Sequence, residues 1–169
     1  DLASLYGAER FGEEGFVSQQ VRGLMIYKAA RDEHRALGGD ENEPVENPDI
    51  AARYLEASDL FEHAIRAPDA SSFTTALGNT MMLVGLCHYY AGGSPEASAR
   101  RAADCFVDAA GRVPEESRAA DALWMAIRAL DIEIDRGGDP ERRLGARRDA
   151  LIDRFPKDHT APQRATATN

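Results

Sequence analysis

The chain has 169 residues, of which 43% are hydrophobic and 29% charged, as in ordinary globular proteins rather than disordered chains. Its net charge of −9 argues against binding to nucleic acid, because phosphates require a basic surface. No apolar stretch approaches the ~20 residues that a membrane-spanning helix needs. We therefore expect a soluble protein without a membrane span. The compartment is left open, with the cytoplasm favoured over the periplasm.

The first residue is Asp1 rather than Met, which indicates a fragment or a processed product of a longer protein. The apolar residues before Gly15 are typical of part of a preceding helix. Residues 1–161 are predicted to form one helical repeat domain, and residues 162–169 a polar tail.

Apolar residues recur every three or four positions along most of the chain, and no run alternates as a β-strand would. This spacing predicts six helices, at residues 14–37, 48–66, 72–91, 95–111, 115–136 and 140–155.

A stop-and-restart signal separates helices at three places: a glycine pair, a polar residue, then Pro and an acid. The three signals are Gly38-Gly39 with Asn47-Pro48-Asp49, Gly92-Gly93-Ser94-Pro95-Glu96, and Gly137-Gly138-Asp139-Pro140-Glu141. Glycine ends a helix in the left-handed conformation, the polar residue caps the next helix, and Pro fits its first turn. Pro68, Pro114 and Pro156 then end the second helix of each pair.

These boundaries predict three antiparallel hairpins, at about residues 14–68, 72–114 and 115–156. Since no hairpin buries its whole apolar face alone, the hairpins are expected to stack into an all-α superhelix. Cys87 and Cys105 would then lie roughly 9 Å apart along the helix axes, too far for a disulfide. Both are interpreted as core residues.

At this point the residues resemble the tetratricopeptide-repeat family. The best first-helix match is residues 81–90, with Gly85 as the small residue that lets two helices approach, followed by Gly92 and Ala97. The second-helix pattern is clearest at residues 57–65, and residues 150–158 resemble the bacterial branch of the family. The match is degenerate: Arg31 stands where a small residue is expected. The unit of about 45 residues also exceeds the family's ~34 and lies in the range of HEAT and armadillo repeats.

In that family the first helices of successive pairs line a concave groove that binds partners. The resemblance therefore implies a groove at matching positions of this chain: Asn79, Met82, Leu86, Tyr89, Tyr90, Asp121, Trp124, Arg128 and Asp131. The alternative is that Tyr89 and Trp124 only pack between hairpins.

We find no residue pattern that predicts catalysis, a cofactor or a metal site. The four histidines lack metal-ligand spacing, and His88 is interpreted as a packing residue. The glycine pairs close helices and match no phosphate-binding loop.

The sequence thus predicts a non-catalytic scaffold that binds a protein, as a peptide or helix in a concave groove. Two alternatives remain open: a self-stacking array, in which the acidic residues 40–49 meet the arginine-rich residues 142–154 of another copy, or a helical accessory domain of a larger protein, possibly an enzyme.

Overall fold

The structure is a computed structural model and describes residues 14–38, 40, 42–92, 98–137 and 142–154. Every regular secondary-structure element in its described part is a helix. The helices are α2 (Phe16–Ala36), α3 (Pro48–Arg66), α4 (Thr74–Tyr90), α5 (Ala99–Ala110), α6 (Glu116–Asp135) and α7 (Arg143–Arg154), with a short 3-10 helix, η2 (Ala70–Ser72), before α4. The six predicted helices are confirmed. None of the helices in the described ranges is long and apolar enough to cross a membrane.

Helix ends follow the predicted capping chemistry where the structure describes it. The Asn47 side chain accepts hydrogen bonds from the backbone N–H groups of Asp49 and Ile50, and Pro48 occupies the first turn of α3. Gly38 and Gly137 have φ angles of 75° and 76°, the left-handed conformation expected after a helix. The rest of the second and third signals, residues 93–97 and 138–141, lies outside the described residues.

The start of α5 differs from the prediction. This helix begins at Ala99 rather than at residue 95, because the Ser98 side chain caps it by accepting a hydrogen bond from the Arg101 N–H, at 3.1 Å. Ser98 was not recognised as a cap because the preceding Ser94-Pro95-Glu96 already had the form of a capping sequence.

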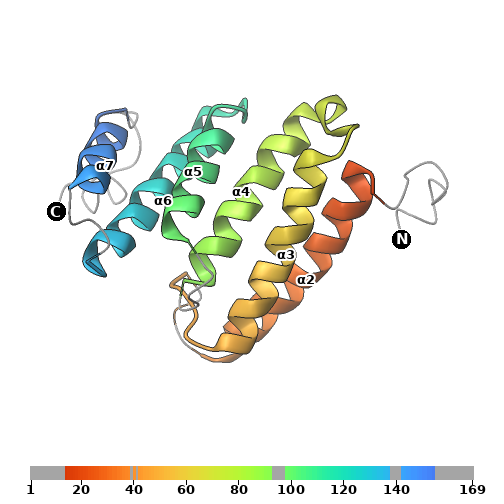
Figure 1. Cartoon of the computed structure of the whole chain (residues 1–169), viewed down its shortest axis with the longest axis horizontal. Coiled ribbons are helices and arrows are strands. Elements are labelled where there is room, and N and C mark those ends of the chain that lie inside the picture. The colour runs from red at the N-terminus through yellow and green to blue at the C-terminus, as the bar shows by residue number, and fades with distance from the viewer. Residues whose placement is uncertain (1–13, 39, 41, 93–97, 138–141, 155–169) are drawn as a thin grey trace.

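The three hairpins α2–α3, α4–α5 and α6–α7 stand side by side along the long axis of the molecule (Figure 1), and each helix packs against the next one in the chain. This arrangement confirms the predicted fold of stacked antiparallel hairpins. Side chains also join every second helix, so that α2, α4 and α6 form one layer and α3, α5 and α7 the other. These pairs are Gln20–Thr80, Asn79–Arg118, Glu62–Arg101 and Asp104–Arg147.

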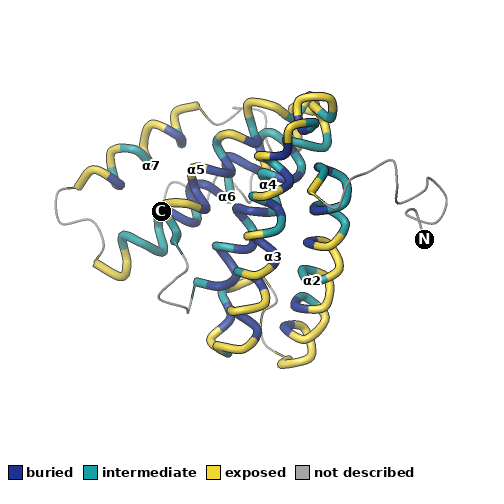
Figure 2. Tube along the Cα trace, turned by 45° about the vertical axis from the view of Figure 1, so that its right-hand side comes forward, coloured by how far each residue is buried: buried dark blue, intermediate teal, exposed yellow. Residues whose placement is uncertain are grey.

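One continuous hydrophobic core runs through all six helices, from Ala30 on α2 to Leu144 and Leu151 on α7. Buried residues lie where helices face one another, and exposed residues lie on the outer surface (Figure 2). A smaller cluster at the start of α2 contains Phe16, whose ring stacks on Phe73 with centroids 5.0 Å apart. In the described part of the chain neither cluster is confined to one hairpin, as expected for a repeat array.

Each of the first two hairpins contains a close contact between a glycine of its first helix and a phenylalanine of its second helix. A Cβ atom added at Gly85 would lie 2.7 Å from Cε1 of Phe106, and one added at Gly23 would lie 2.7 Å from Cε1 of Phe61. Both rings are completely buried. The predicted close approach at Gly85 is thus confirmed. Gly23 plays this part in the first hairpin and was missed.

The two cysteines are free and buried, as predicted. Burial raises the pKa of the Cys105 thiol to about 11 and that of Cys87 well above its usual value. Both thiols are therefore protonated at neutral pH and behave as small core side chains.

We expect Gly85→Ala to lower the free energy of unfolding by about 1–3 kcal/mol, because the new methyl group meets a buried ring that has no room to move. Gly111 is the matched control. Its φ of −75° suits alanine, and an added Cβ there would meet nothing closer than 3.6 Å. Gly111→Ala should be neutral or stabilise by up to about 1 kcal/mol. Urea unfolding of both variants tests this, and equal stabilities would contradict the glycine–phenylalanine constraint.

Candidate functional site

The nine residues predicted to line a groove all lie on α4 and α6, which are neighbours in one layer. We call this set the α4–α6 face: Asn79, Met82, Leu86, Tyr89, Tyr90, Asp121, Trp124, Arg128 and Asp131. Its two helices are joined at one end by a hydrogen bond of 2.9 Å, which Arg118 donates to the Asn79 side chain. Asn79, Met82, Leu86 and Trp124 are partly exposed, and Asp121 is exposed.

Tyr89 and Tyr90 are buried, with only 2% and 7% of their surface exposed. The segment between α2 and α3 is the reason. The Val45 N–H donates a hydrogen bond of 2.8 Å to the Tyr90 carbonyl, and Val45 is buried in the same core cluster as both rings. On the α2 side, the Arg31 guanidinium lies 4.5 Å from the Tyr90 ring centroid. These tyrosines therefore support the face from beneath.

Two charged residues of the α4–α6 face are already paired within the chain. Arg128 forms an ion pair with Glu43, and its guanidinium lies 5.9 Å from the centroid of the Tyr89 ring. Asp131 pairs with Arg148 of α7 at 3.2 Å. A partner that used either charge would have to exchange with the present one.

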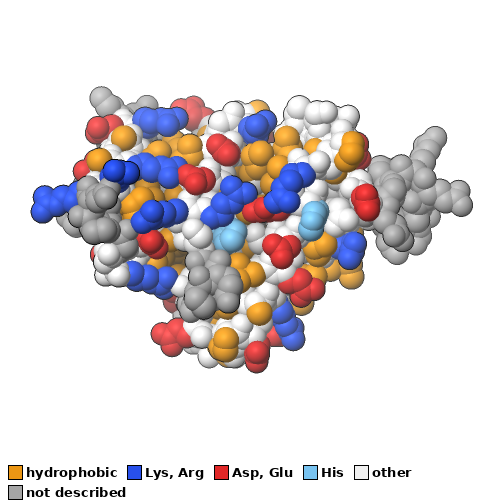
Figure 3. Space-filling model, in the orientation of Figure 1, with side chains coloured by type: hydrophobic (Ala, Val, Ile, Leu, Met, Phe, Trp, Pro, Cys, Tyr) orange, Lys and Arg blue, Asp and Glu red, His pale blue; other side chains and the backbone are white. Residues whose placement is uncertain are grey.

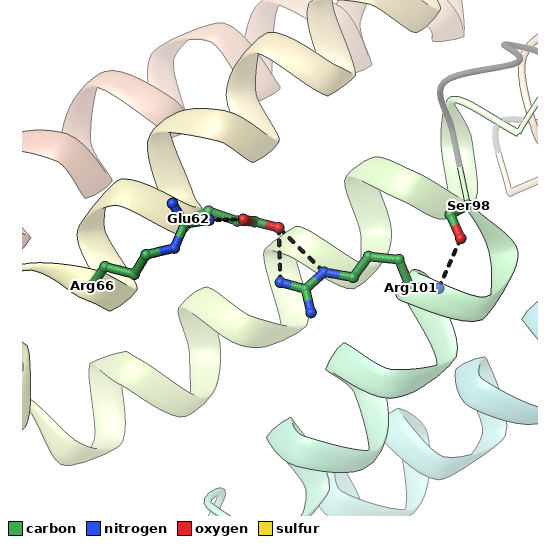
Figure 4. A network of polar contacts seen from close by, with 4 residues as sticks. All are labelled: Glu62, Arg66, Ser98 and Arg101. Atoms are coloured by element: carbon green, nitrogen blue, oxygen red, sulfur yellow. Dashed lines mark hydrogen bonds and ion pairs between the residues drawn. The ribbon is translucent and has the colours of Figure 1, made fainter.

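A polar cluster lies between α3, α4 and α5 (Figure 4). The Glu62 carboxylate accepts hydrogen bonds from Nε and Nη2 of Arg101, at 3.2 and 2.8 Å, and also pairs with Arg66. Burial acts to raise the pKa of Glu62, but the two arginines outweigh it and hold that pKa below its usual value. The cluster ties the first hairpin to the second.

His88 of α4 lies beside this cluster, and its buried Nδ1 atom has no hydrogen-bond partner among the described residues. Burial lowers the pKa of His88, Arg101 lowers it further, and the carboxylates of Glu62 and Asp59 oppose the shift. The imidazole is therefore kept neutral. This position agrees with the packing role that the sequence indicated.

Two arginines of the arginine-rich helix α7 also form ion pairs within the chain. Arg147 pairs with Asp104 of α5, and Arg148 pairs with Asp131 and Asp149. Across the face that bears α3, α5 and α7, acidic and basic side chains are intermixed, with basic ones gathered toward α7 (Figure 3). Within the described ranges, no group of three or more His, Cys, Asp or Glu side chains could hold a metal ion.

The sequence did not reveal a second feature, on the outer edge of the first hairpin. Two adjoining hollows, of about 390 and 310 Å³, lie between α2 and α3 and share Met25, Ile26 and Glu56. We call them together the α2–α3 hollow. Its other lining residues are Arg22, Ala29, Arg53, Asp59, Leu60 and His63.

Met25 is the most exposed large apolar side chain at this edge, with 70% of its surface exposed. A sequence signal for it existed in the run Leu24-Met25-Ile26-Tyr27. Four consecutive residues point around most of a helix, so they cannot all face one core. Leu24, at 40% exposed, and Met25 are the two that face outward.

A comparison of the chain with models of known protein families, with curated proteins and with solved structures finds no match to any of them.

The His88 environment predicts a pH-dependent stability. Because its pKa is lowered by folding, the unfolded chain binds a proton that the folded chain does not, and stability is lost as pH falls below about 6.5. We expect His88→Gln to flatten the fall in unfolding free energy between pH 7.5 and 5.5. The unmodified chain, measured over the same pH range, is the control. An identical slope in both proteins would contradict the assignment.

Proposed function

We propose that this chain is a non-catalytic protein-interaction module that binds a helix of a partner protein along the α2–α3 hollow. The observation that carries this proposal is an apolar edge, centred on Met25, that the described chain leaves uncovered. Exposed methionines adapt to varied partner surfaces and are common at sites that bind helices.

The first hairpin offers two edges, and its inner edge already binds a helix. There α4 packs against α3, and Tyr54 contacts Tyr90 with ring centroids 5.5 Å apart. The outer edge is also formed by two antiparallel helices with apolar side chains between them. There, however, Met25, Ile26 and Leu60 line a hollow and do not pack against a further helix of the described chain. A helix is therefore the occupant that this edge fits best.

The charges around the hollow define the partner further. Arg22 and Arg53 lie on its rim together with the acids Glu56 and Asp59. A matching helix would carry apolar residues at spacings of three and four, flanked by both acids and bases. A helix with one sign of charge along both flanks would meet like charges on this rim.

The stacked hairpins and the close approach at Gly85 support a relationship to tetratricopeptide-like repeats, and with it a role in binding proteins. Self-stacking through the acidic and arginine-rich surfaces has less support. Glu43, Arg147 and Arg148 are paired within one chain, so contacts between copies would have to replace these pairs.

The test is selection of helix-forming 20-residue peptides from a displayed library on the immobilised chain. We expect selected peptides to lose at least tenfold in affinity for Met25→Glu, because a charge enters the apolar hollow; tenfold corresponds to about 1.4 kcal/mol. Ala52→Glu makes the same change of charge at an exposed position of α3 outside the hollow, and should bind as the unmodified chain does.

Selected peptides that bind Met25→Glu undiminished would remove the hollow as the site, and failure to select any peptide would count against a peptide-binding function. Sedimentation of the same proteins separates the alternative of self-stacking. Association through this edge would disappear in Met25→Glu, whereas association through surface charges would weaken as salt is raised.

A further inference from the structure

The α4–α6 face carries a second inference, which is separate from the α2–α3 hollow. Residues 43–45, which belong to the connection between α2 and α3, contact this face near the end of α4. Residues 44–46 are in neither a helix nor a turn. The chain thus places a short non-helical segment of its own on the surface predicted to take a partner.

Three successive residues of this segment make three different kinds of contact. The Glu43 carboxylate pairs with Arg128, Pro44 lies against Gly92, and Val45 is buried with its N–H bonded to the Tyr90 carbonyl. That carbonyl is among the last in α4, which have no partner within the helix. A charged pair, an apolar contact and a main-chain hydrogen bond are also how folded surfaces recognise extended peptides.

The three contacts differ in how readily they exchange. Val45 is only 2% exposed and belongs to the core, so it stays in place. The side chains of Glu43 and Arg128 are 48% and 33% exposed, and exposed ion pairs of this kind contribute little net stability. An outside carboxylate can therefore replace Glu43 without unfolding the segment.

The α4–α6 face continues beyond Arg128 along α4. Leu86 and Met82 are partly exposed and apolar, and Asn79 with Arg118 lies at the far end. A peptide whose acid met Arg128 would lay its following residues on this apolar stretch.

We propose that Arg128 is the position at which this face binds an acidic residue of a partner peptide, and that Glu43 occupies that position in the free chain. The partner is an extended segment that combines an acid with neighbouring apolar residues. Glu43 acts as a built-in competitor, because a tethered group has an effective concentration in the millimolar range.

The test uses a fluorescein-labelled peptide with the sequence of residues 42–47, Asn-Glu-Pro-Val-Glu-Asn, and fluorescence anisotropy at low salt. We expect Glu43→Gln to bind it about two- to fivefold more tightly than the unmodified chain, because Arg128 becomes available and an exposed ion pair is worth at most about 1 kcal/mol. Glu46→Gln removes an equal charge from an exposed position of the same segment, and should change the affinity less than twofold.

Two further measurements tie any gain to the proposed pair. The gain in affinity should vanish in the double variant Glu43→Gln/Arg128→Gln. It should also vanish when the peptide carries Gln in place of its first Glu. Circular dichroism confirms that each variant keeps its helices. Absence of binding to Glu43→Gln, an equal gain in Glu46→Gln, or a gain that survives Arg128→Gln would each overturn the inference. The proposal for the α2–α3 hollow would be unaffected by any of these results.

Discussion

The close contact between a glycine of one helix and a phenylalanine of the next is the constraint on which the first two hairpins depend. Gly23 and Gly85 admit the rings of Phe61 and Phe106, so each helix pair comes together tightly over a fully buried aromatic side chain. In the third hairpin the first helix, α6, contains no glycine and so has no such contact. The place of this hairpin in the array depends on the contact of α6 with α5 and on Leu144 and Leu151. In stacked repeats, each unit relies on its neighbours for stability.

The segment that lies over the α4–α6 face rests on a rigid support. Beneath it, Nδ1 of His34 lies 3.1 Å from the Tyr54 hydroxyl, and both rings contact Tyr90. Burial raises the pKa of Tyr54 to about 12, and Arg31 acts against it, so the hydroxyl stays protonated across the physiological range. The Val45 N–H bonds to the Tyr90 carbonyl above this buried aromatic group, whereas the Glu43 side chain is 48% exposed. A surface of fixed shape with one replaceable contact suits a binding role better than a disordered loop would.

Local chemistry explains which features the sequence predicted. The six helices and the cap at Asn47 depend on residues close together in the chain, and the small residue at Gly85 can be read directly from the sequence. The covering of Tyr89 and Tyr90 depends instead on residues far apart in the chain. Glu43 and Arg128 are 85 residues apart, and nothing local specifies their pairing. The exposed edge at Met25 was missed for another reason. Helical periodicity shows that a residue is apolar, but it does not show whether a neighbouring hairpin covers it.

Arginine side chains set the register between hairpins in this acidic protein. Arg101 reaches Glu62, Arg118 reaches Asn79, and Arg128 lies over Tyr89, each across an offset of 39 residues. Each of these arginines is at least partly exposed, so its net contribution to stability is only about 0–1 kcal/mol. Their planar guanidinium groups nevertheless favour one relative position of two helices, because several donors must meet fixed acceptors at once. This matters for the proposed binding role. Hairpins held at one spacing would present Met82, Leu86 and Arg128 as a constant set, and a surface that is already ordered would not have to be ordered again when a partner binds.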